Sequence, residues 1–212
     1  MGFFDRVRET LRDRTRENFC DGLQRLGIHA QMAERGCAEE NIGLGGPLTS
    51  RNYTKSLGVI DISEGPIHWV NVLKKREPGE GGGSIVYYAE YAVPDTRLGP
   101  NSPRLRIKSV SVKTFPLVGK VVDLNWKGID FGLRFIGRMN SDLGWKLIER
   151  LNSDPELKEP IIKSRKVTIG GSVIIRARCD HCCWIIATEI HSAPSIELWN
   201  CYQSIAQHLL AE

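Results

Sequence analysis

The chain has 212 residues, of which 41% are hydrophobic, 25% charged and 8% aromatic, and its formal net charge is +4. These values are close to those of an average soluble globular domain, and they exclude collagen-like, coiled-coil and disordered proteins. The length is sufficient for a hydrophobic core that needs no disulfide bonds. No motif in the sequence identifies a substrate, so the sequence predicts a fold class more firmly than a function.

The longest apolar stretch near the C-terminus covers 182–187, which is far short of the ~20 residues that a membrane-spanning helix requires. The first residues lack the basic region and apolar core of a secretory signal. We therefore expect a cytoplasmic protein with no transmembrane segment. In that compartment its six cysteines are expected to be reduced thiols rather than a disulfide framework.

The sequence divides into an N-terminal helical arm over 1–40, a Gly-rich linker or loop over 41–55, and an α+β domain over 56–212. In the arm, apolar residues recur every three or four positions from Phe4 to Leu26, which predicts an amphipathic helix that stops at Gly27. A second helical piece is expected over 31–35. The apolar face of the arm predicts docking on the body of the protein, on a second copy or on a partner protein.

Alternating side chains predict strands after the linker. The expected strands cover 58–62, 66–75, 84–93, 104–115, 118–126, 163–169, 172–178 and 183–190. The second and third of these should form an antiparallel hairpin. In the fourth strand, the alternate positions change from charged (Arg106, Lys108) to apolar (Val110, Val112). This change indicates a bulge near Ser109 or a break between two short strands.

Helical spacing returns from Phe135 to Leu151, and a short helical turn is expected at Pro155. The final helix opens near Pro194 and carries a broad apolar face that includes Leu198, Trp199 and Leu209. The predicted fold is therefore α+β: an antiparallel β-sheet assembly packed by a C-terminal helix, with an N-terminal helical arm.

The most unusual string in the sequence is Cys179-Asp180-His181-Cys182-Cys183. Thiolate and imidazole are the ligands that zinc prefers, and the gap between Cys179 and Cys182 lets one turn direct both sulfur atoms at one ion. A metal (zinc-type) site or a thiol-redox site at Cys179, His181, Cys182 and Cys183 is therefore one hypothesis. The sequence offers no second cysteine pair nearby, so small residues at a turn are the alternative interpretation.

Positive charge is concentrated in residues 101–170, which hold 14 basic and 7 acidic side chains. Arg104, Arg106 and Lys108 share one face of a predicted strand, and they would form a basic ladder with Lys163 and Arg165, or with Arg176 and Arg178, if those strands are neighbours. Such a ladder predicts salt-dependent binding of an anion or a nucleic acid. Tyr87, Tyr88 and Tyr91 are candidate stacking platforms for the bases of a single strand.

No nucleophile, metalloprotease or kinase motif occurs, and the functional hypothesis leans away from an enzyme. The favoured interpretation is a non-catalytic binding or scaffolding module that assembles with itself or with a partner protein through its N-terminal helix. The alternatives are a metal-binding or thiol-redox protein, with zinc as the expected metal, and an anion or nucleic-acid binder that uses the basic central strands.

Overall fold

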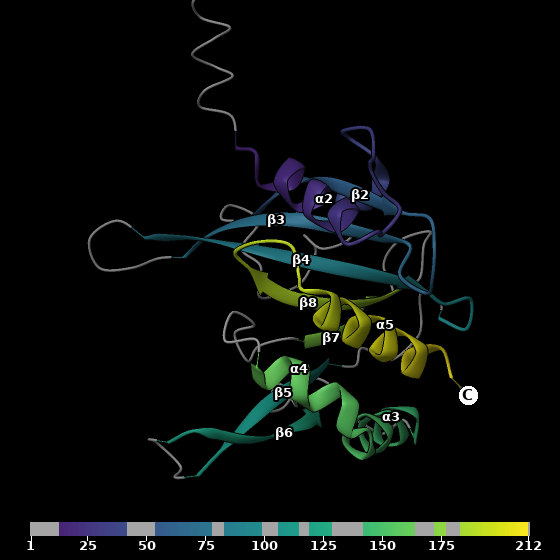
Figure 1. Cartoon of the computed structure of the whole chain (residues 1–212). Helices are drawn as coiled ribbons and strands as arrows, with labels where there is room; N and C mark the ends of the chain where they lie inside the picture. The colour runs from purple at the N-terminus through teal and green to yellow at the C-terminus, as the bar shows by residue number, and fades with distance from the viewer. Residues whose placement is uncertain are drawn as a thin grey trace, which may run out of the picture.

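The computed structural model describes residues 13–41, 54–77, 83–98, 106–114, 119–128, 142–163, 172–176 and 183–211. Within these ranges, eight strands form one antiparallel sheet, and helices lie across one of its faces (Figure 1). The predicted α+β class is confirmed, as are the antiparallel sheet, the C-terminal helix and an N-terminal helix.

The elements follow in chain order. They are α2 (Thr15–Arg25), β1 (Ala30–Met32), η1 (Ala38–Asn41), β2 (Thr54–Ile62), β3 (Trp69–Glu77), β4 (Ser84–Pro94), β5 (Arg106–Lys113), β6 (Val121–Gly128), α3 (Asp142–Ser153), η2 (Pro155–Leu157), α4 (Lys158–Lys163), β7 (Ser172–Arg176), β8 (Cys183–Ile190) and α5 (Ile196–Leu210). The strand order is β1-β2-β3-β4-β8-β7-β5-β6, so the last strand of the sequence lies in the interior of the sheet.

Sequence alternation predicted most of these strands correctly. The β3–β4 hairpin pairs in continuous register from Glu77 opposite Ser84 to Trp69 opposite Ala92, and β8 has the predicted bounds. Two segments were assigned to the wrong type of element. The segment expected as a second helical piece contributes β1, because its backbone completes the edge of the sheet beside β2. Lys163, expected to begin a strand, instead ends helix α4.

The main core lies between the sheet and the helices. Strand register places Ile60, Val70, Tyr91 and Ile186 in one row across β2, β3, β4 and β8, and all four are buried. Tyr91 contacts the ring of Tyr202 from α5, with a centroid distance of 4.6 Å. Burying such side chains contributes ~1.5–3 kcal/mol each, so this layer supplies much of the folding free energy.

The N-terminal helix packs on the sheet of its own chain. Phe19, Cys20 and Leu23 of α2 are buried in the main core, and Gly27 ends the helix region at a positive φ of 81°. The start of the predicted arm (1–12) and residues 42–53 of the predicted linker lie outside the described residues. Assembly through the N-terminal helix therefore stays a prediction.

Hydrogen bonds that run from buried Asp95 through partly exposed Arg97 attach the C-terminal helix α5 to the sheet. Asp95 accepts hydrogen bonds from the Trp184 indole (2.8 Å) and from the Arg97 guanidinium (2.8 Å). Arg97 also donates to the carbonyl oxygens of Leu209 (2.9 Å) and Ala211 (3.3 Å). Because the C-terminus of a helix carries partial negative charge, this cation stabilises the end of α5.

At both edges of the described sheet, side chains form hydrogen bonds with backbone amide and carbonyl groups. At the β6 edge, Asn152 of α3 accepts from the Trp126 amide (2.8 Å) and donates to the Trp126 carbonyl (3.0 Å), while Asp123 accepts from the Leu124 amide (2.7 Å). At the β1 edge, Gln24 donates to the Ala30 carbonyl (2.8 Å). Occupied edges reduce unwanted pairing with strands of other chains.

None of the helices in the described ranges combines the length and the apolar character required to cross a bilayer.

Candidate functional site

The strongest candidate site lies on the face of the sheet opposite the helices, at the hairpin formed by β5 and β6. Residues 106–128 contain five basic side chains and one acidic side chain. We call the described residues of this segment the basic hairpin. Lys108 lies directly opposite Lys127 in the antiparallel register. Two like charges in this position repel each other, so the pair is an electrostatically unfavourable arrangement within the fold.

Packing on the other face explains why these lysines point away from the helices. Ile107 and Ser109 are fully buried toward the helical layer, as are Leu124 and Trp126 of β6. Side chains alternate along a strand, so Lys108 and Lys127 occupy the opposite face. Lys127 is exposed and Lys108 is half-buried.

The bulge predicted near Ser109 is not present. The register runs without interruption from Ile107 opposite Gly128 to Val112 opposite Asp123, and it shifts only between Val112 and Lys113. The alternation was misinterpreted because Ser109 is a polar residue on the buried face. Val110 and Val112 therefore share the outer face with Lys108.

Strand β7 is the other neighbour of β5, as the predicted ladder requires. Arg106 lies opposite Ile174, and Lys108 lies opposite Ser172. Arg176 is two positions beyond Ile174, at the end of β7. Arg104 and Arg178 lie outside the described residues, as does Arg165. Lys163 cannot join a ladder of strands, because it ends helix α4.

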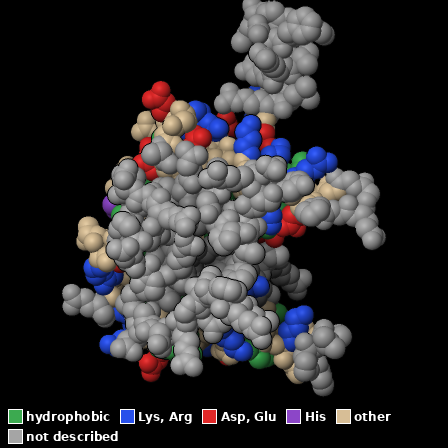
Figure 2. Space-filling view, turned by 180° about the vertical axis from the view of Figure 1, so that it is seen from behind, with side chains coloured by type: hydrophobic (Ala, Val, Ile, Leu, Met, Phe, Trp, Pro, Cys, Tyr) green, Lys and Arg blue, Asp and Glu red, His purple; other side chains and the backbone are tan. Residues whose placement is uncertain are grey.

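The lysines of the basic hairpin have no ion-pair partner among the described residues. The acidic side chain of the hairpin, Asp123, is itself paired with Lys158 at 3.2 Å. Its pKa is lowered by the hydrogen bond from the Leu124 amide and by Lys158, so it remains ionised and committed to that contact. Figure 2, in which the hairpin lies at the lower right, shows Lys and Arg side chains there.

Three of these lysines were not singled out from the sequence. They are Lys113 and Lys120, which flank the outer end of the hairpin and are exposed, and Lys127. The high basic count of residues 101–170 was the available signal. It could not show that residues of two different strands meet, because register depends on the pairing of the strands.

The predicted metal or thiol-redox cluster cannot be assembled from the described residues. Cys179, His181 and Cys182 lie outside them. Cys183 is fully buried in β8, where it packs in a second apolar cluster with Trp69 and Ile185. In the part of the chain that the structure describes, no group of His, Cys, Asp and Glu side chains could hold a metal ion. Zinc binding stays a prediction, which elemental analysis of the protein and of Cys179→Ser would test.

The tyrosines considered as stacking platforms do not form one surface. Tyr91 is buried in the main core against Tyr202. Tyr87 and Tyr88 are consecutive in β4 and therefore face opposite sides of the sheet. The Tyr87 hydroxyl donates to Asp13 (3.0 Å) and the Tyr88 hydroxyl donates to Glu77 (3.3 Å). The structure thus does not bring the three rings together.

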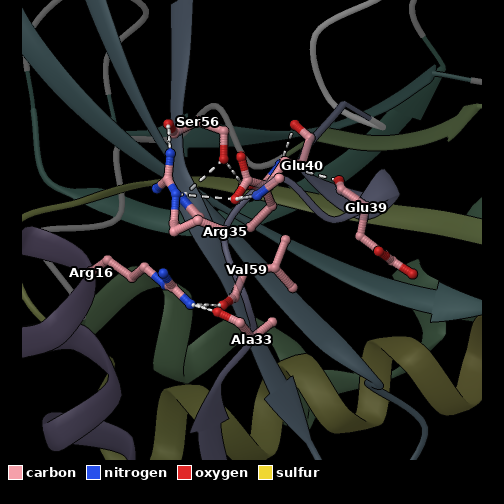
Figure 3. Close-up of polar contacts among 10 residues, drawn as sticks. Arg16, Ala33, Arg35, Glu39, Glu40, Ser56 and Val59 are labelled. Carbon is pink, nitrogen blue, oxygen red and sulfur yellow. Dashed lines mark hydrogen bonds and ion pairs between the residues drawn. The ribbon is translucent and has the colours of Figure 1, made fainter.

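A second polar cluster surrounds Gly58, and the sequence did not single it out (Figure 3). The buried guanidinium of Arg16 donates to the carbonyl of Val59 (2.6 Å) and to that of Ala33. Arg35 forms an ion pair with Glu40 (3.2 Å). Burial lowers the pKa of Arg16, and the nearby charge of Arg35 adds to this effect. The spacing of Arg16 with Phe19, Cys20 and Leu23 was the signal that its side chain lies on the buried face.

This cluster attaches the segment after β1 to the sheet. Asn71 donates to the carbonyl oxygens of Glu40 (3.1 Å) and Glu39 (3.5 Å), and it accepts from the Ser56 hydroxyl (2.7 Å). Because these groups bind one another or the backbone, the cluster has a structural role, and the basic hairpin remains the better candidate site.

No protein-family model, curated protein or solved structure matches this chain.

Proposed function

We propose that the chain is a non-catalytic binding module that holds an anionic ligand on the outer face of the basic hairpin. The observation that carries the proposal is the direct opposition of Lys108 and Lys127, with no described carboxylate paired to either. Two further basic residues, Arg106 in β5 and Arg176 in β7, lie on strands that are neighbours in the sheet.

The electrostatics of the pair support this proposal. Repulsion between opposed ammonium groups destabilises the folded protein. A bound anion that contacts both groups would offset this repulsion. Such a contact is partly exposed to solvent, so salt should weaken it strongly. The two opposed lysines place two positive charges on one face of the hairpin, which supports binding of an anion.

Among the described aspartates with shifted pKa values, Asp95 and Asp154 have lowered pKa values and structural partners, whereas burial raises the pKa of Asp61. Burial opposes the ionisation of Asp95, but hydrogen bonds from Arg97 and Trp184 lower its pKa overall. Contact with His208 likewise lowers the pKa of Asp154, against the effect of burial. Asp95 and Asp154 therefore remain ionised and engaged in structural contacts, so neither is a candidate general acid, which needs a raised pKa.

Retention on immobilised heparin tests the proposal. The wild-type protein should bind and elute only at raised salt, and Lys108→Gln combined with Lys127→Gln should elute at clearly lower salt. The matched control is Lys55→Gln combined with Lys146→Gln, which removes the same charge from exposed positions outside the hairpin.

Circular dichroism of each variant checks that the fold is kept. The control should elute with the wild type. Equal elution of all three proteins would contradict the proposal, because Lys108 and Lys127 would then make no contribution to binding. An equal loss of retention in the two variants would also contradict it, because net charge alone would then determine binding.

A further inference from the structure

We infer that Arg16 and Arg35 bind a compact oxyanion, such as inorganic phosphate or the phosphate group of a small molecule, beside Gly58. The contacts that give this cluster its structural role leave part of its positive charge unpaired among the described residues. Burial of Arg16, its incomplete set of hydrogen bonds and the proximity of Arg35 carry the inference. The site is separate from the basic hairpin, since β2 and the β5–β6 pair lie toward opposite edges of the sheet.

Arg16 is a buried cation that no described carboxylate contacts. It is only 5% exposed, and both of its hydrogen bonds go to uncharged carbonyl groups. A charge removed from water is costly unless it is paired, so buried guanidinium groups normally contact an anion. Burial and the neighbouring charge of Arg35 lower the pKa of Arg16, and the charges of Glu17 and Glu40 only partly offset these effects through space. The electrostatics at Arg16 therefore favour an added negative charge.

The hydrogen bonds of Arg16 use only one of its terminal nitrogen atoms. Nη2 donates to the carbonyl groups of Ala33 and Val59. Nε is buried and has no hydrogen-bond partner, and the remaining nitrogen atom, Nη1, lies beside Gly58. Buried donors are normally paired in folded proteins. Arg16 therefore retains donor capacity that its contacts within the described residues do not use.

Arg35 supplies a second guanidinium group at the same place. The position of a Cβ atom on residue 58 would be 2.6 Å from Nη1 of Arg16 and 2.8 Å from Nη1 of Arg35. The two side chains reach β2 from different segments, Arg16 from α2 and Arg35 from the segment after β1 (Figure 3). One small anion can therefore contact both groups, and arginine binds phosphate through short, charge-assisted hydrogen bonds.

Among the described residues, Glu40 supplies the carboxylate that contacts this pair. Its Oε1 atom contacts Nε of Arg35 (3.2 Å) and accepts from the Gly36 amide (3.0 Å). One carboxylate thus faces two guanidinium groups, so a positive charge remains for a ligand to neutralise. Glu40 should also compete with that ligand for Arg35.

The exposure of the two arginines favours a small ligand over a polymer. The side chain of Arg35 is 50% exposed, whereas Arg16 is almost completely buried. A ligand must therefore approach from the side of Arg35 and reach inward to contact Arg16. A compact oxyanion can do this, whereas the bulk of a polymer would hold its charges at the surface.

Isothermal titration calorimetry with inorganic phosphate at constant ionic strength tests the inference. Every protein titrated carries Lys108→Gln and Lys127→Gln, so that this lysine pair contributes no binding. We expect one phosphate to bind per chain. Arg35→Gln should weaken binding at least about tenfold, because charge-assisted hydrogen bonds are lost. Arg35→Lys should also weaken it, because lysine lacks the planar fork of donors. Arg25→Gln, at an exposed position of α2, is the control and should leave the affinity unchanged.

Glu40→Gln should have the opposite effect. Loss of the competing carboxylate should tighten phosphate binding several-fold, whereas Glu34→Gln removes the same charge at an exposed position and should not change it. Circular dichroism checks the fold of each variant. Absence of phosphate binding both to the parent protein and to Glu40→Gln overturns the inference. Equal affinities of Arg35→Gln and Arg25→Gln, or of Glu40→Gln and Glu34→Gln, also overturn it, because the cluster would then have no specific effect on binding.

Discussion

Gly58 is the residue on which the polar cluster at β2 depends. Its φ is +121°, in a region that side chains bearing a Cβ rarely adopt. A Cβ atom added there would lie 2.6 Å from one terminal nitrogen of Arg16 and 2.8 Å from one of Arg35. The two guanidinium groups therefore approach the backbone closely because residue 58 has no side chain. A single glycine lets the sheet accommodate a buried cation beside a partly exposed one.

Gly58→Ala should lower the free energy of unfolding by about 1–3 kcal/mol, because it adds backbone strain and displaces Arg16. Gly27→Ala is the matched control: its φ is +81°, but nothing lies within 4 Å of the added Cβ. In the control, the free energy of unfolding should fall only by the conformational cost of a side chain at positive φ, about 1–2 kcal/mol. Urea denaturation measures both values. Equal decreases in the free energy of unfolding would show that the close approach of the two arginines to residue 58 does not affect stability.

Lys127, which we propose contacts the anionic ligand, is expected to reduce stability because it lies opposite Lys108. Lys127→Glu would place an opposite charge across from Lys108, and an opposed charge pair contributes roughly 0.2–1 kcal/mol. We expect a protein that is slightly more stable than the wild type and that binds heparin less tightly. Thermal denaturation at low salt, followed by heparin chromatography, measures the two effects. A less stable Lys127→Glu protein would argue against repulsion between Lys108 and Lys127.

Among the elements, β6 shows how the edge of a sheet is occupied without another strand. The amide of Asn152 supplies one donor and one acceptor to Trp126, which are the groups that a neighbouring strand would offer. Helix α3 thereby occupies part of the edge while its apolar side chains Leu147 and Leu151 fill the core. At Trp126, the edge beside the proposed ligand surface is thus closed to strand addition.

Asn152→Ala should lower the free energy of unfolding by about 1–3 kcal/mol, because it leaves the amide and carbonyl of Trp126 without partners. The open edge should also promote concentration-dependent association. Asn125→Ala, on the same strand and partly exposed, serves as the control. Size-exclusion chromatography over a range of concentrations measures the association. A monodisperse Asn152→Ala protein of unchanged stability would contradict the assigned role of Asn152.

At the scale of the whole molecule, Asp13 joins the N-terminal segment to β3 and β4, two neighbouring strands in the interior of the sheet. It accepts from Lys74 of β3 (2.7 Å), from Tyr87 of β4 (3.0 Å) and from the Thr15 hydroxyl (2.6 Å). Burial opposes its ionisation, but these hydrogen bonds outweigh burial and lower its pKa from 3.8 to about 2. The carboxylate therefore favours the folded state most when it is ionised in both states.

Because the folded pKa is below the unfolded value, this contribution is complete above about pH 4 and disappears as pH falls through about 2. Its size is about 2 kcal/mol. The stability difference between the wild type and Asp13→Asn should therefore be largest near neutral pH and shrink toward pH 2. Urea denaturation across this range measures it. A difference independent of pH would show that ionisation of Asp13 has no stabilising effect.

Regular alternation of side chains made most of the described sheet predictable. The strand at Cys183–Ile190 and the helix at Ile196–Leu210 follow directly from the period of their apolar residues. Prediction failed where that period gives no information. The strand β1 has only three residues, and its identity comes from pairing with β2. Ser109 is a polar residue in a buried position.

The candidate site was only partly predictable for a similar reason. Arg106 and Lys108 could be assigned to one face of a strand from the sequence, because they are neighbours in the alternation. Lys127 could not be joined to them, because cross-strand neighbours are fixed by register and not by distance along the sequence. The same limit applies to Arg16, whose carbonyl partners at Ala33 and Val59 come from two other segments.

The interior position of β8 has a consequence for how the protein is made. Tyr87 of β4 pairs with Ile190, and β8 alone connects β4 to β7 in the described sheet. A ribosome has therefore synthesised most of the chain before the strand that joins the two halves of the sheet emerges. Contacts between residues so distant in sequence slow folding. Until β8 pairs, the edges of β4 and β7 that it covers are exposed. We therefore expect the nascent polypeptide to require chaperone protection at this stage of translation.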